Sequence, residues 1–259
     1  MFNLGLIARM ITHNGAHYTM WWAGFQFRKN SHRFVMDSSV DEIDRLVLQT
    51  LIRKRTLRKS DIKEIMNRLS EEKKTTLHFK DVLKSINTKL EPINFEISYV
   101  RSEMDGQLVF GIIDHNQDDI TNISNSLKPV EISVFTKIID HYIDDPETPL
   151  TIEKLQNIVA NENRSSADTF KSILQHLIDE LWIVKVDNTV LISDFAQITI
   201  KYRMRKGGDI ENKICAFCSD ILIHGMSCKN CRALFHKCCS EIYQTRTGNK
   251  NCVKCQNTL

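Results

Sequence analysis

The chain has 259 residues, of which 42% are hydrophobic and 26% are charged, a composition typical of a folded soluble protein with two or three small domains. No stretch approaches the ~18 consecutive apolar residues of a membrane-spanning helix, so we expect no membrane contact. The net charge of +3 is distributed unevenly, because the amino-terminal end is strongly basic.

The first 36 residues carry four basic side chains and no Asp or Glu, so this segment alone contributes +4. An acid-free, basic leader resembles a mitochondrial transit peptide, but transit peptides are usually rich in Ser and this segment is not. We therefore expect residues 1–37 to form a basic, poorly ordered extension, with targeting as the less favoured alternative. The four basic residues are Arg9, Arg28, Lys29 and Arg33.

Three helical patterns followed by a hairpin pattern occupy residues 38–115, an order typical of a winged-helix domain. The first helix is expected to begin near Ser39, which has a Glu three residues later as in a capping box. A second helix is expected behind a Ser60 cap, and a third that stops before Pro92. The apolar period then changes to two around a turn at Asp105–Gly106. The apolar strand residues are Phe95, Ile97, Tyr99, Leu108, Phe110 and Ile112.

The same order of patterns repeats over residues 126–195, after a polar stretch at 116–126. Three helical segments are followed by a hairpin with its turn at Asp187–Asn188, which predicts a second winged helix. The two halves share no clear residue-level identity, so the repeat is architectural. Residues 196–212 are expected to form a basic connecting helix that ends in a hinge at Gly207–Gly208.

All eight cysteines of the chain fall between positions 215 and 255. Three Cys-x-x-Cys pairs and one His-x-x-Cys pair supply eight ligands, enough for two closed Zn²⁺ sites with four N or S ligands each. A disulfide framework is the less favoured alternative, because no signal peptide is visible and two-residue spacers suit a metal. The pairs are Cys215 and Cys218, Cys228 and Cys231, His236 and Cys239, and Cys252 and Cys255.

One cysteine is left over, because two adjacent cysteines follow His236 and the two-residue spacer selects Cys239 as the ligand. Cys238 is then a small core residue or a free thiol. With nine residues between the first two pairs, each zinc could bind sequential pairs or interleaved ones. Seven basic side chains against two acidic ones over residues 213–259 compensate the negative charge of thiolate sites.

Winged helices bind DNA with the third helix in the major groove, or they bind proteins. The third helix of the first unit carries Lys80, Lys84 and Lys89 against one acidic residue, whereas that of the second carries Lys171 against three. We therefore expect a DNA contact through the first winged helix and a protein contact through the second. The basic run at 53–59 is consistent both with a nuclear localisation or nucleic-acid patch and with a solvated helix end. No catalytic constellation stands out, so any enzymatic activity must come from the cysteine-rich segment.

The ligand spacing resembles that of the RING and PHD finger families, which interleave their pairs in a cross-brace. A PHD finger usually carries Trp two residues before its seventh ligand, where this chain has Lys250. A RING favours a bulky apolar residue before its second ligand, where this chain has Phe217, so the variant RING is the preferred interpretation. The resemblance implies one zinc held by Cys215, Cys218, His236 and Cys239, and a second held by Cys228, Cys231, Cys252 and Cys255.

The expected fold class is therefore α+β, with tandem winged-helix domains followed by a small cross-braced two-zinc RING-like module at residues 213–259. The ligand order of this variant RING is four cysteines, one histidine and three cysteines. The order of domains resembles one family, the RING-bearing non-SMC element (element one) of the SMC five/six DNA-repair complex. The resemblance covers residues 38–255 and is carried mainly by the segments ICAFC, LIHG, SCKNC and FH. It implies a nuclear subunit that docks a MAGE-family partner through its winged helices, assembles with a kleisin and SMC subunits, and acts as a ubiquitin ligase.

A RING ligase has no nucleophile, so no catalytic residue is expected, and the conjugating enzyme is activated by positioning. The resemblance implies a docking groove formed by Phe217, Ile221 and Ile223, with Val253 on the opposite zinc loop. Two residues depart from active RINGs: Val253 replaces a usual Pro, and Gln256 replaces an Arg or Lys. The competing interpretations are a PHD-like chromatin reader and a zinc module that is purely structural.

Overall fold

The structure, a computed structural model, describes residues 38–259 except for 75, 116–126, 164–166 and 208–212. The predictions for the extension at 1–37, the joining stretch at 116–126 and Gly208 of the hinge therefore lie outside the described residues. Among the helices of the described part, none combines the length and the apolar character needed to cross a bilayer.

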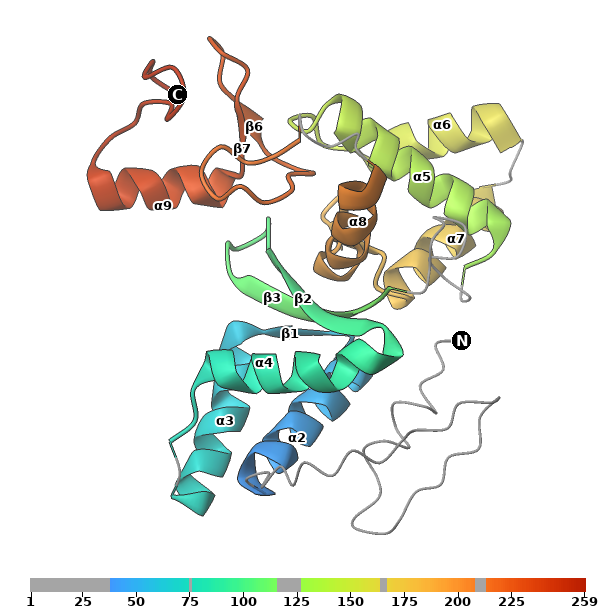
Figure 1. Ribbon diagram of the computed structural model, residues 1–259. Coiled ribbons are helices and arrows are strands. Elements are labelled where there is room, and N and C mark those ends of the chain that lie inside the picture. Colours follow the sequence, from blue (N-terminus) through green and yellow to red (C-terminus); the bar gives the residue numbers. More distant parts are fainter. Residues whose placement is uncertain (1–37, 75, 116–126, 164–166, 208–212) are drawn as a thin grey trace.

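The first unit consists of three helices packed against a small sheet (Figure 1). The predicted order of three helices and a hairpin is present, and the third helix ends before Pro92 as predicted. The strand order is β1-β3-β2, and both pairings are antiparallel. The elements are α2 (Ser38–Lys54), β1 (Thr56–Arg58), α3 (Lys59–Lys73), α4 (Phe79–Leu90), the 3₁₀ helix η1 (Glu91–Ile93), β2 (Phe95–Arg101) and β3 (Leu108–Asp114).

Helix α2 begins at Ser38, in agreement with the predicted start near Ser39. The cap of the second helix differs from the prediction. The cap of α3 is Arg58 and not Ser60, because the Asp61 carboxylate accepts the backbone N–H of Arg58 at 3.2 Å. An acidic side chain in the first turn can satisfy that N–H without a hydroxyl at the cap itself.

The basic run at 53–59 is divided among three elements. Arg55 has a positive φ of 63°, which ends α2 and starts the unpredicted strand β1. The Arg55 guanidinium then pairs with Glu180 of the second unit at 2.7 Å, while Arg58 pairs with Asp105. Both arginines are therefore engaged inside the molecule, and the run is neither a simple helix end nor a wholly free patch.

The hairpin of the first unit is covered on both faces. The predicted apolar face packs on the helices through Ile97 and Phe110, whereas Tyr99 on that face remains 48% exposed. On the other face, Val100 and Val109 form a separate buried cluster with Ile198 of α8 (Asp194–Gly207). The strands therefore carry apolar residues beyond the simple alternation, because a helix from a later part of the chain covers their second face.

The second unit repeats the plan with its own buried core. The Tyr142 hydroxyl donates to the carbonyl of Val190 at 2.6 Å and accepts the N–H of Leu150 at 3.2 Å, which joins the first helix to the hairpin. The elements are α5 (Pro129–Asp144), α6 (Ile152–Asn163), α7 (Ala167–Asp179) and the antiparallel strands β4 (Ile183–Val186) and β5 (Thr189–Ile192).

Helix α8 does more than connect the second unit to the cysteine-rich segment. Phe195 and Ile200 belong to the core of the second unit, whereas Ile198 packs on the sheet of the first. Gly111 on β3 allows this approach, since a Cβ added there would lie 3.0 Å from Cδ1 of Ile198 and 3.4 Å from the carbonyl of Arg55. The helix therefore joins the two units by packing into both.

The cysteine-rich segment lies above the β2–β3 hairpin and beside α5 in Figure 1. It contains β6 (Met226–Ser227), β7 (Leu234–Phe235) and α9 (Lys237–Thr247). The backbone N–H of Gly225 donates to the carbonyl of Pro146 at 3.1 Å, and Lys201 of α8 pairs with Asp220 at 2.7 Å. The predicted α+β class is confirmed, and the segment packs against both winged-helix units.

Replacement of Ile198 by Ala should lower the free energy of unfolding by about 2–5 kcal/mol, because Ile198 is 1% exposed and the truncation leaves a cavity between the units. Leu46→Ala is the control, since Leu46 is 38% exposed and surface substitutions usually change stability by only ~0.5 kcal/mol. Urea unfolding of the zinc-loaded chain, followed by circular dichroism, measures both. A loss below about 1 kcal/mol for Ile198→Ala would contradict the packing of α8.

Candidate metal centres

The structure brings the eight predicted ligands together as two groups of four. Within each group the ligand atoms lie within 4.8 Å of one another. The groups interleave along the chain, because each takes alternate pairs, as a cross-brace requires. The first group is Cys215, Cys218, His236 and Cys239, and the second is Cys228, Cys231, Cys252 and Cys255.

The distances between ligand atoms suit a tetrahedral zinc ion. Around Zn²⁺ with Zn–S of ~2.3 Å and Zn–N of ~2.0 Å, tetrahedral geometry separates the ligand atoms by about 3.5–3.8 Å. Nδ1 of His236 lies 3.4 Å from Sγ of Cys218 and 3.6 Å from Sγ of Cys239. In the second group the Sγ···Sγ separations are 3.6 Å for Cys228 and Cys255, and 3.7 Å for Cys231 and Cys252. All eight cysteines are free, and these separations are far from the ~2.05 Å of a disulfide.

Each Cys-x-x-Cys pair lies on the same kind of turn. The carbonyl of the first cysteine accepts the N–H of the residue that follows the second cysteine, at 2.8–2.9 Å. That following residue adopts a positive φ in all three pairs, namely Ser219 (57°), Arg232 (56°) and Gln256 (62°). The fourth pair uses a helix instead, since His236 is the N-cap of α9 and Cys239 lies in its first turn. Local backbone geometry therefore brings the two ligand atoms of each pair close together.

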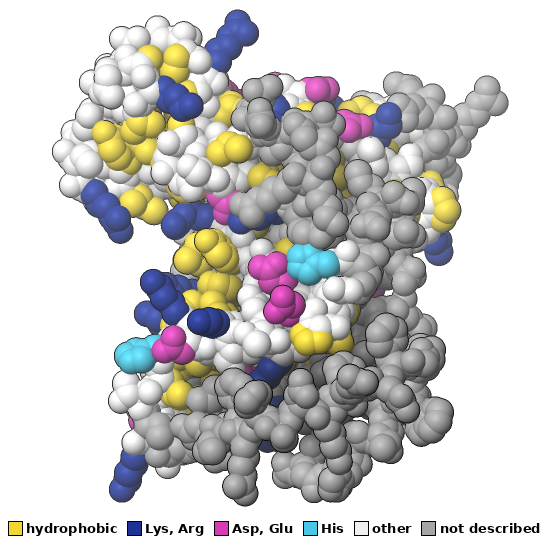
Figure 2. Space-filling model, viewed as in Figure 1, with side chains coloured by type: hydrophobic (Ala, Val, Ile, Leu, Met, Phe, Trp, Pro, Cys, Tyr) yellow, Lys and Arg dark blue, Asp and Glu magenta, His cyan; other side chains and the backbone are white. Residues whose placement is uncertain are grey.

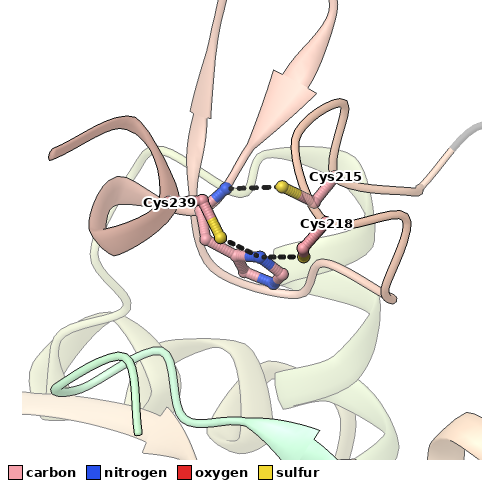
Figure 3. Close-up of side chains that lie close together, drawn as sticks. Cys215, Cys218 and Cys239 are labelled. Carbon is pink, nitrogen blue, oxygen red and sulfur yellow. Dashed lines mark hydrogen bonds between the residues drawn. The ribbon is translucent and has the colours of Figure 1, made fainter. Parts of the chain in front are cut away.

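In the first group the imidazole of His236 lies between the sulfurs of Cys218 and Cys239, and Sγ of Cys215 accepts the backbone N–H of His236 at 3.5 Å (Figure 3). The other ring nitrogen of His236, Nε2, donates to the carbonyl of Ile221 at 3.0 Å and lies 3.5 Å from Oε1 of Glu103. Because Nε2 carries the proton in this arrangement, Nδ1 is free to bind a metal. The carbonyl and the carboxylate thus orient the ring toward the three sulfurs.

The two groups differ in their exposure to solvent. Cys215, His236 and Cys239 are nearly inaccessible, whereas Cys231 of the second group is exposed. In the second group, N–H groups of Cys231 and Asn230 lower the pKa of the Cys228 thiol from 9.0 to about 6. A thiolate is the form that binds zinc, so these two N–H groups favour the ligand state of Cys228.

Glu103 lies beside the first ligand group, although it was not among the site residues predicted from the sequence. It lies in the turn between β2 and β3, yet its carboxylate accepts the N–H groups of Ile223 at 2.9 Å and His224 at 3.0 Å, and contacts the ring of His224. Burial alone would raise its pKa, but hydrogen bonds from His224 and His236 outweigh burial and lower the pKa from 4.5 to about 2. No local pattern could have indicated this role, because Glu103 precedes an ordinary Asp-Gly turn.

The predicted docking residues do not form one groove. Phe217 is half-buried between Phe235 and Tyr243, with ring centroids 5.7 and 5.0 Å away. The prediction for Ile223 is wrong, because this residue is 5% exposed and belongs to the core of the second winged helix. Ile221 packs against the same core. Val253 is half-buried and does not line the pocket beside Phe217.

That pocket has a volume of about 270 Å³ and lies between the first ligand turn, α9 and the end of β2. Its apolar wall continues from Phe217 to Ile242 and Tyr243 of α9, and Arg101 and Arg246 supply positive charge. Ile242 is 37% exposed. No sequence pattern indicated this contribution of α9, because Ile242 and Tyr243 form this wall only beside Phe217.

A family model described as "Nse1 non-SMC component of SMC5-6 complex" matches residues 44–191, more than half of the chain. The chain belongs to this family. The match spans both winged-helix units and ends before the ligand groups. The evidence for the metal centres is therefore the geometry of the ligands and not the family match.

Curated relatives extend the similarity over most of the chain. The "Non-structural maintenance of chromosomes element 1 homolog" of Homo sapiens is 21% identical over 221 residues, which cover 83% of each chain. The "Non-structural maintenance of chromosomes element 1" of Schizosaccharomyces pombe is 21% identical over 197 residues, and the alignment covers 75% of this chain and 83% of the relative. A solved structure named "Nse1-Nse3-Nse4 complex" contains a chain that is 20% identical, with a TM-score of 0.69 over 86% of this chain and 96% of that one. This likeness supports the same fold.

The chain should bind two zinc ions, and the two adjacent cysteines should differ in their effect on metal content. Cys239→Ala removes a ligand from the His236 group and should reduce zinc content to one ion or fewer. Cys238 lies outside both groups, so Cys238→Ala should retain two. Native mass spectrometry with metal analysis measures both variants. A reversed result would show that the ligand register is wrong, and disulfides in place of zinc would exclude the cross-brace.

Proposed function

We propose that the chain is a subunit of an SMC5-6 complex that acts in the nucleus in DNA repair and chromosome maintenance, and that its cysteine-rich segment is a two-zinc RING-type ubiquitin ligase module. The observation that carries this proposal is the interleaving of two four-ligand groups on the fold of the Nse1 family. Reduced thiolate ligands also suit a nuclear or cytosolic compartment.

The proposed partners follow from the family. The solved structure with a similar chain is named as a complex with two further subunits, Nse3 and Nse4. The resemblance identified in the sequence implies a MAGE-family protein, a kleisin and the SMC subunits as partners. We propose that the second winged helix contributes to these contacts, because its hairpin exposes Val184 (37%) and Val186 (36%) and its third helix is acidic.

The pocket beside Phe217 is the proposed contact for the ubiquitin-conjugating enzyme. It combines an aromatic side chain from the first ligand turn with exposed apolar residues of α9, which gives an apolar surface next to a rigid metal site. The ligase would supply no nucleophile and would act by orienting the thioester of the conjugating enzyme. Val253 remains a proposed contact on the second ligand group, at a separate position.

A purely structural zinc module is the competing function, and two observations favour it. Ile221 and Ile223, which the resemblance assigned to docking, are used for packing on the second winged helix. Gln256 also stands where an Arg or Lys would make a charge-assisted contact with ubiquitin, and such contacts are roughly twice as strong as neutral ones. The two functions are separated by activity measurements on variants that keep their zinc.

Phe217→Ala should slow ubiquitin discharge from a conjugating enzyme by roughly 10- to 30-fold, because a buried aromatic anchor contributes ~2 kcal/mol or more to a contact. The assay uses the full chain with a MAGE-family partner, since slow discharge is expected for the chain alone. Met226→Ala is the matched control, because Met226 is an exposed apolar residue of the same segment outside the pocket.

Each variant must contain two zinc ions, so that a slower discharge rate can be attributed to the lost contact with the conjugating enzyme and not to the loss of zinc. Gln256→Arg should accelerate discharge, since it restores the missing charge. Equal rates for the wild type, Phe217→Ala and Gln256→Arg would leave the zinc module structural only.

We also propose that the first winged helix contacts DNA. Figure 2 shows that the surface is hollowed below the cysteine-rich segment, with Lys and Arg side chains gathered there. A groove of about 840 Å³ at this place is lined by Lys59, Lys63 and Lys80, with Tyr99 on its wall. Lys89 is not available as predicted, because it pairs with Asp44 at 2.8 Å.

The double variant Lys63→Glu with Lys80→Glu should weaken binding to duplex DNA and reduce the slope of log K against log salt by about 2, because each lost phosphate contact removes ~0.9. Lys171→Glu is the control, since Lys171 lies on the third helix of the second unit. Fluorescence anisotropy at several salt concentrations measures the slopes. An unchanged slope in the double variant would exclude this groove as the DNA contact.

A further inference from the structure

We propose that the turn between β2 and β3 of the first winged-helix unit (residues 102–107, the wing) stabilises zinc binding at the metal site that contains His236. In this proposal Glu103 of the wing is the positioning residue of that site, so that zinc binding there is coupled to the placement of the first unit. The inference rests on the zinc binding proposed above and adds a regulation of one of the two sites.

Glu103 reaches the metal site from a distant part of the chain. Its side chain is 5% exposed, although it belongs to a hairpin turn, where charged residues normally point to solvent. Burying a carboxylate is costly unless hydrogen bonds compensate the loss of water. Here they do: besides Ile223 and His224, the side-chain amide of Gln197 on α8 donates to Glu103 at 3.1 Å.

These bonds hold the segment that orients the metal ligand. The N–H groups of Ile223 and His224 are fixed by Glu103, and the carbonyl of Ile221 just before them accepts the Nε2 proton of His236. Oε1 of Glu103 also lies 3.5 Å from Nε2 of His236. A carboxylate or carbonyl on the far nitrogen of a histidine ligand sets its tautomer and raises its basicity. Glu103 therefore acts on the ligand both directly and through the backbone.

A second contact brings the wing against the helix that carries Cys239. A Cβ added at Gly106 would lie 2.9 Å from Cβ of Cys238, closer than real Cβ contacts, and Gly106 has a positive φ of 71°. Sγ of Cys238 is also 4.0 Å from the carbonyl of Ser102. The spare cysteine is thus part of the surface on which the wing rests, beside the ligand pair His236 and Cys239.

Within the part of the chain that the structure describes, only one of the two metal sites has this support. The second group of ligands has no contact with the wing among the interactions recorded for the described residues, and its Cys231 is exposed. If displacement of the wing weakens zinc binding at the first site, then zinc binding must stabilise the wing by the same free energy. A partner that moves the first unit would therefore change the module that is proposed to hold the conjugating enzyme.

The test compares Glu103→Gln with Glu96→Gln in the full chain. Glu96 lies on β2 of the same hairpin, but its carboxylate is exposed and contacts only His115 among the described partners, at 3.1 Å. Zinc release to an excess of a chromogenic chelator is followed by absorbance. Loss of such a partner usually lowers metal affinity by roughly 10- to 100-fold, so in Glu103→Gln one of the two zinc ions should leave faster by a comparable factor, while the other leaves at the wild-type rate.

Substitution by Co²⁺ identifies the site, because an ion bound by three thiolates and one imidazole absorbs differently from an ion bound by four thiolates. The bands of the site that contains His236 should change in Glu103→Gln and stay unchanged in Glu96→Gln. The inference would be overturned if Glu103→Gln released both ions at the wild-type rate, or if the substitution accelerated the release of both ions equally. A wild-type chain without zinc would instead contradict the proposed function.

A measurement on the wild-type chain covers the case in which Glu103→Gln does not fold. The N–H of Gly106 donates to the carbonyl of Ser102, and the N–H of Ser102 to that of Gln107, both at 2.8 Å, so hydrogen exchange can report on the wing. Removal of zinc should speed exchange at these amides, but not in α4 of the same unit. Equal exchange of the wing with and without zinc would refute the coupling.

Discussion

The buried carboxylate of Glu103 is the interaction on which the arrangement of the three parts depends. It lies where the hairpin of the first winged helix, helix α8 and the loop at Ile221–His224 meet, and it accepts hydrogen bonds from the last two. These hydrogen bonds stabilise the buried charge, since an unpaired buried charge is strongly destabilising. Oε1 of the same carboxylate lies 3.5 Å from Nε2 of His236, a member of the first ligand group.

Helix α8 provides the apolar counterpart of this polar junction. It buries residues on two sides, with Phe195 and Ile200 in one core and Ile198 on the sheet of the other unit. Two domains of one chain are expected to move relative to one another unless a large interface holds them. Here a shared helix, the Arg55–Glu180 pair and the wing contact connect the two units and the cysteine-rich segment.

The two ligand groups consequently have different surroundings. The His236 group contacts Glu103 from outside the segment, whereas the all-cysteine group combines buried Cys228 and Cys252 with exposed Cys231. The pocket beside Phe217 adjoins the enclosed group and includes Arg101 from the end of β2. A module that meets a conjugating enzyme at this pocket would therefore present a surface made partly by the first winged helix, which gives a physical reason for activity that depends on partners.

The eight ligands could be predicted from the sequence, because each pair is brought together by a local turn or a helix start and the spacing of two residues suffices to show it. The sequence also determined the helices and hairpins, whose apolar periods are local signals, and with them the α+β class. Three features became visible only in the folded chain: Ile223 is buried, β1 exists, and Glu103 lies beside His236 while Gly106 packs against Cys238. The physical reason is distance along the chain: Glu103 meets residues 120 positions later, and no periodicity in either segment records such a contact.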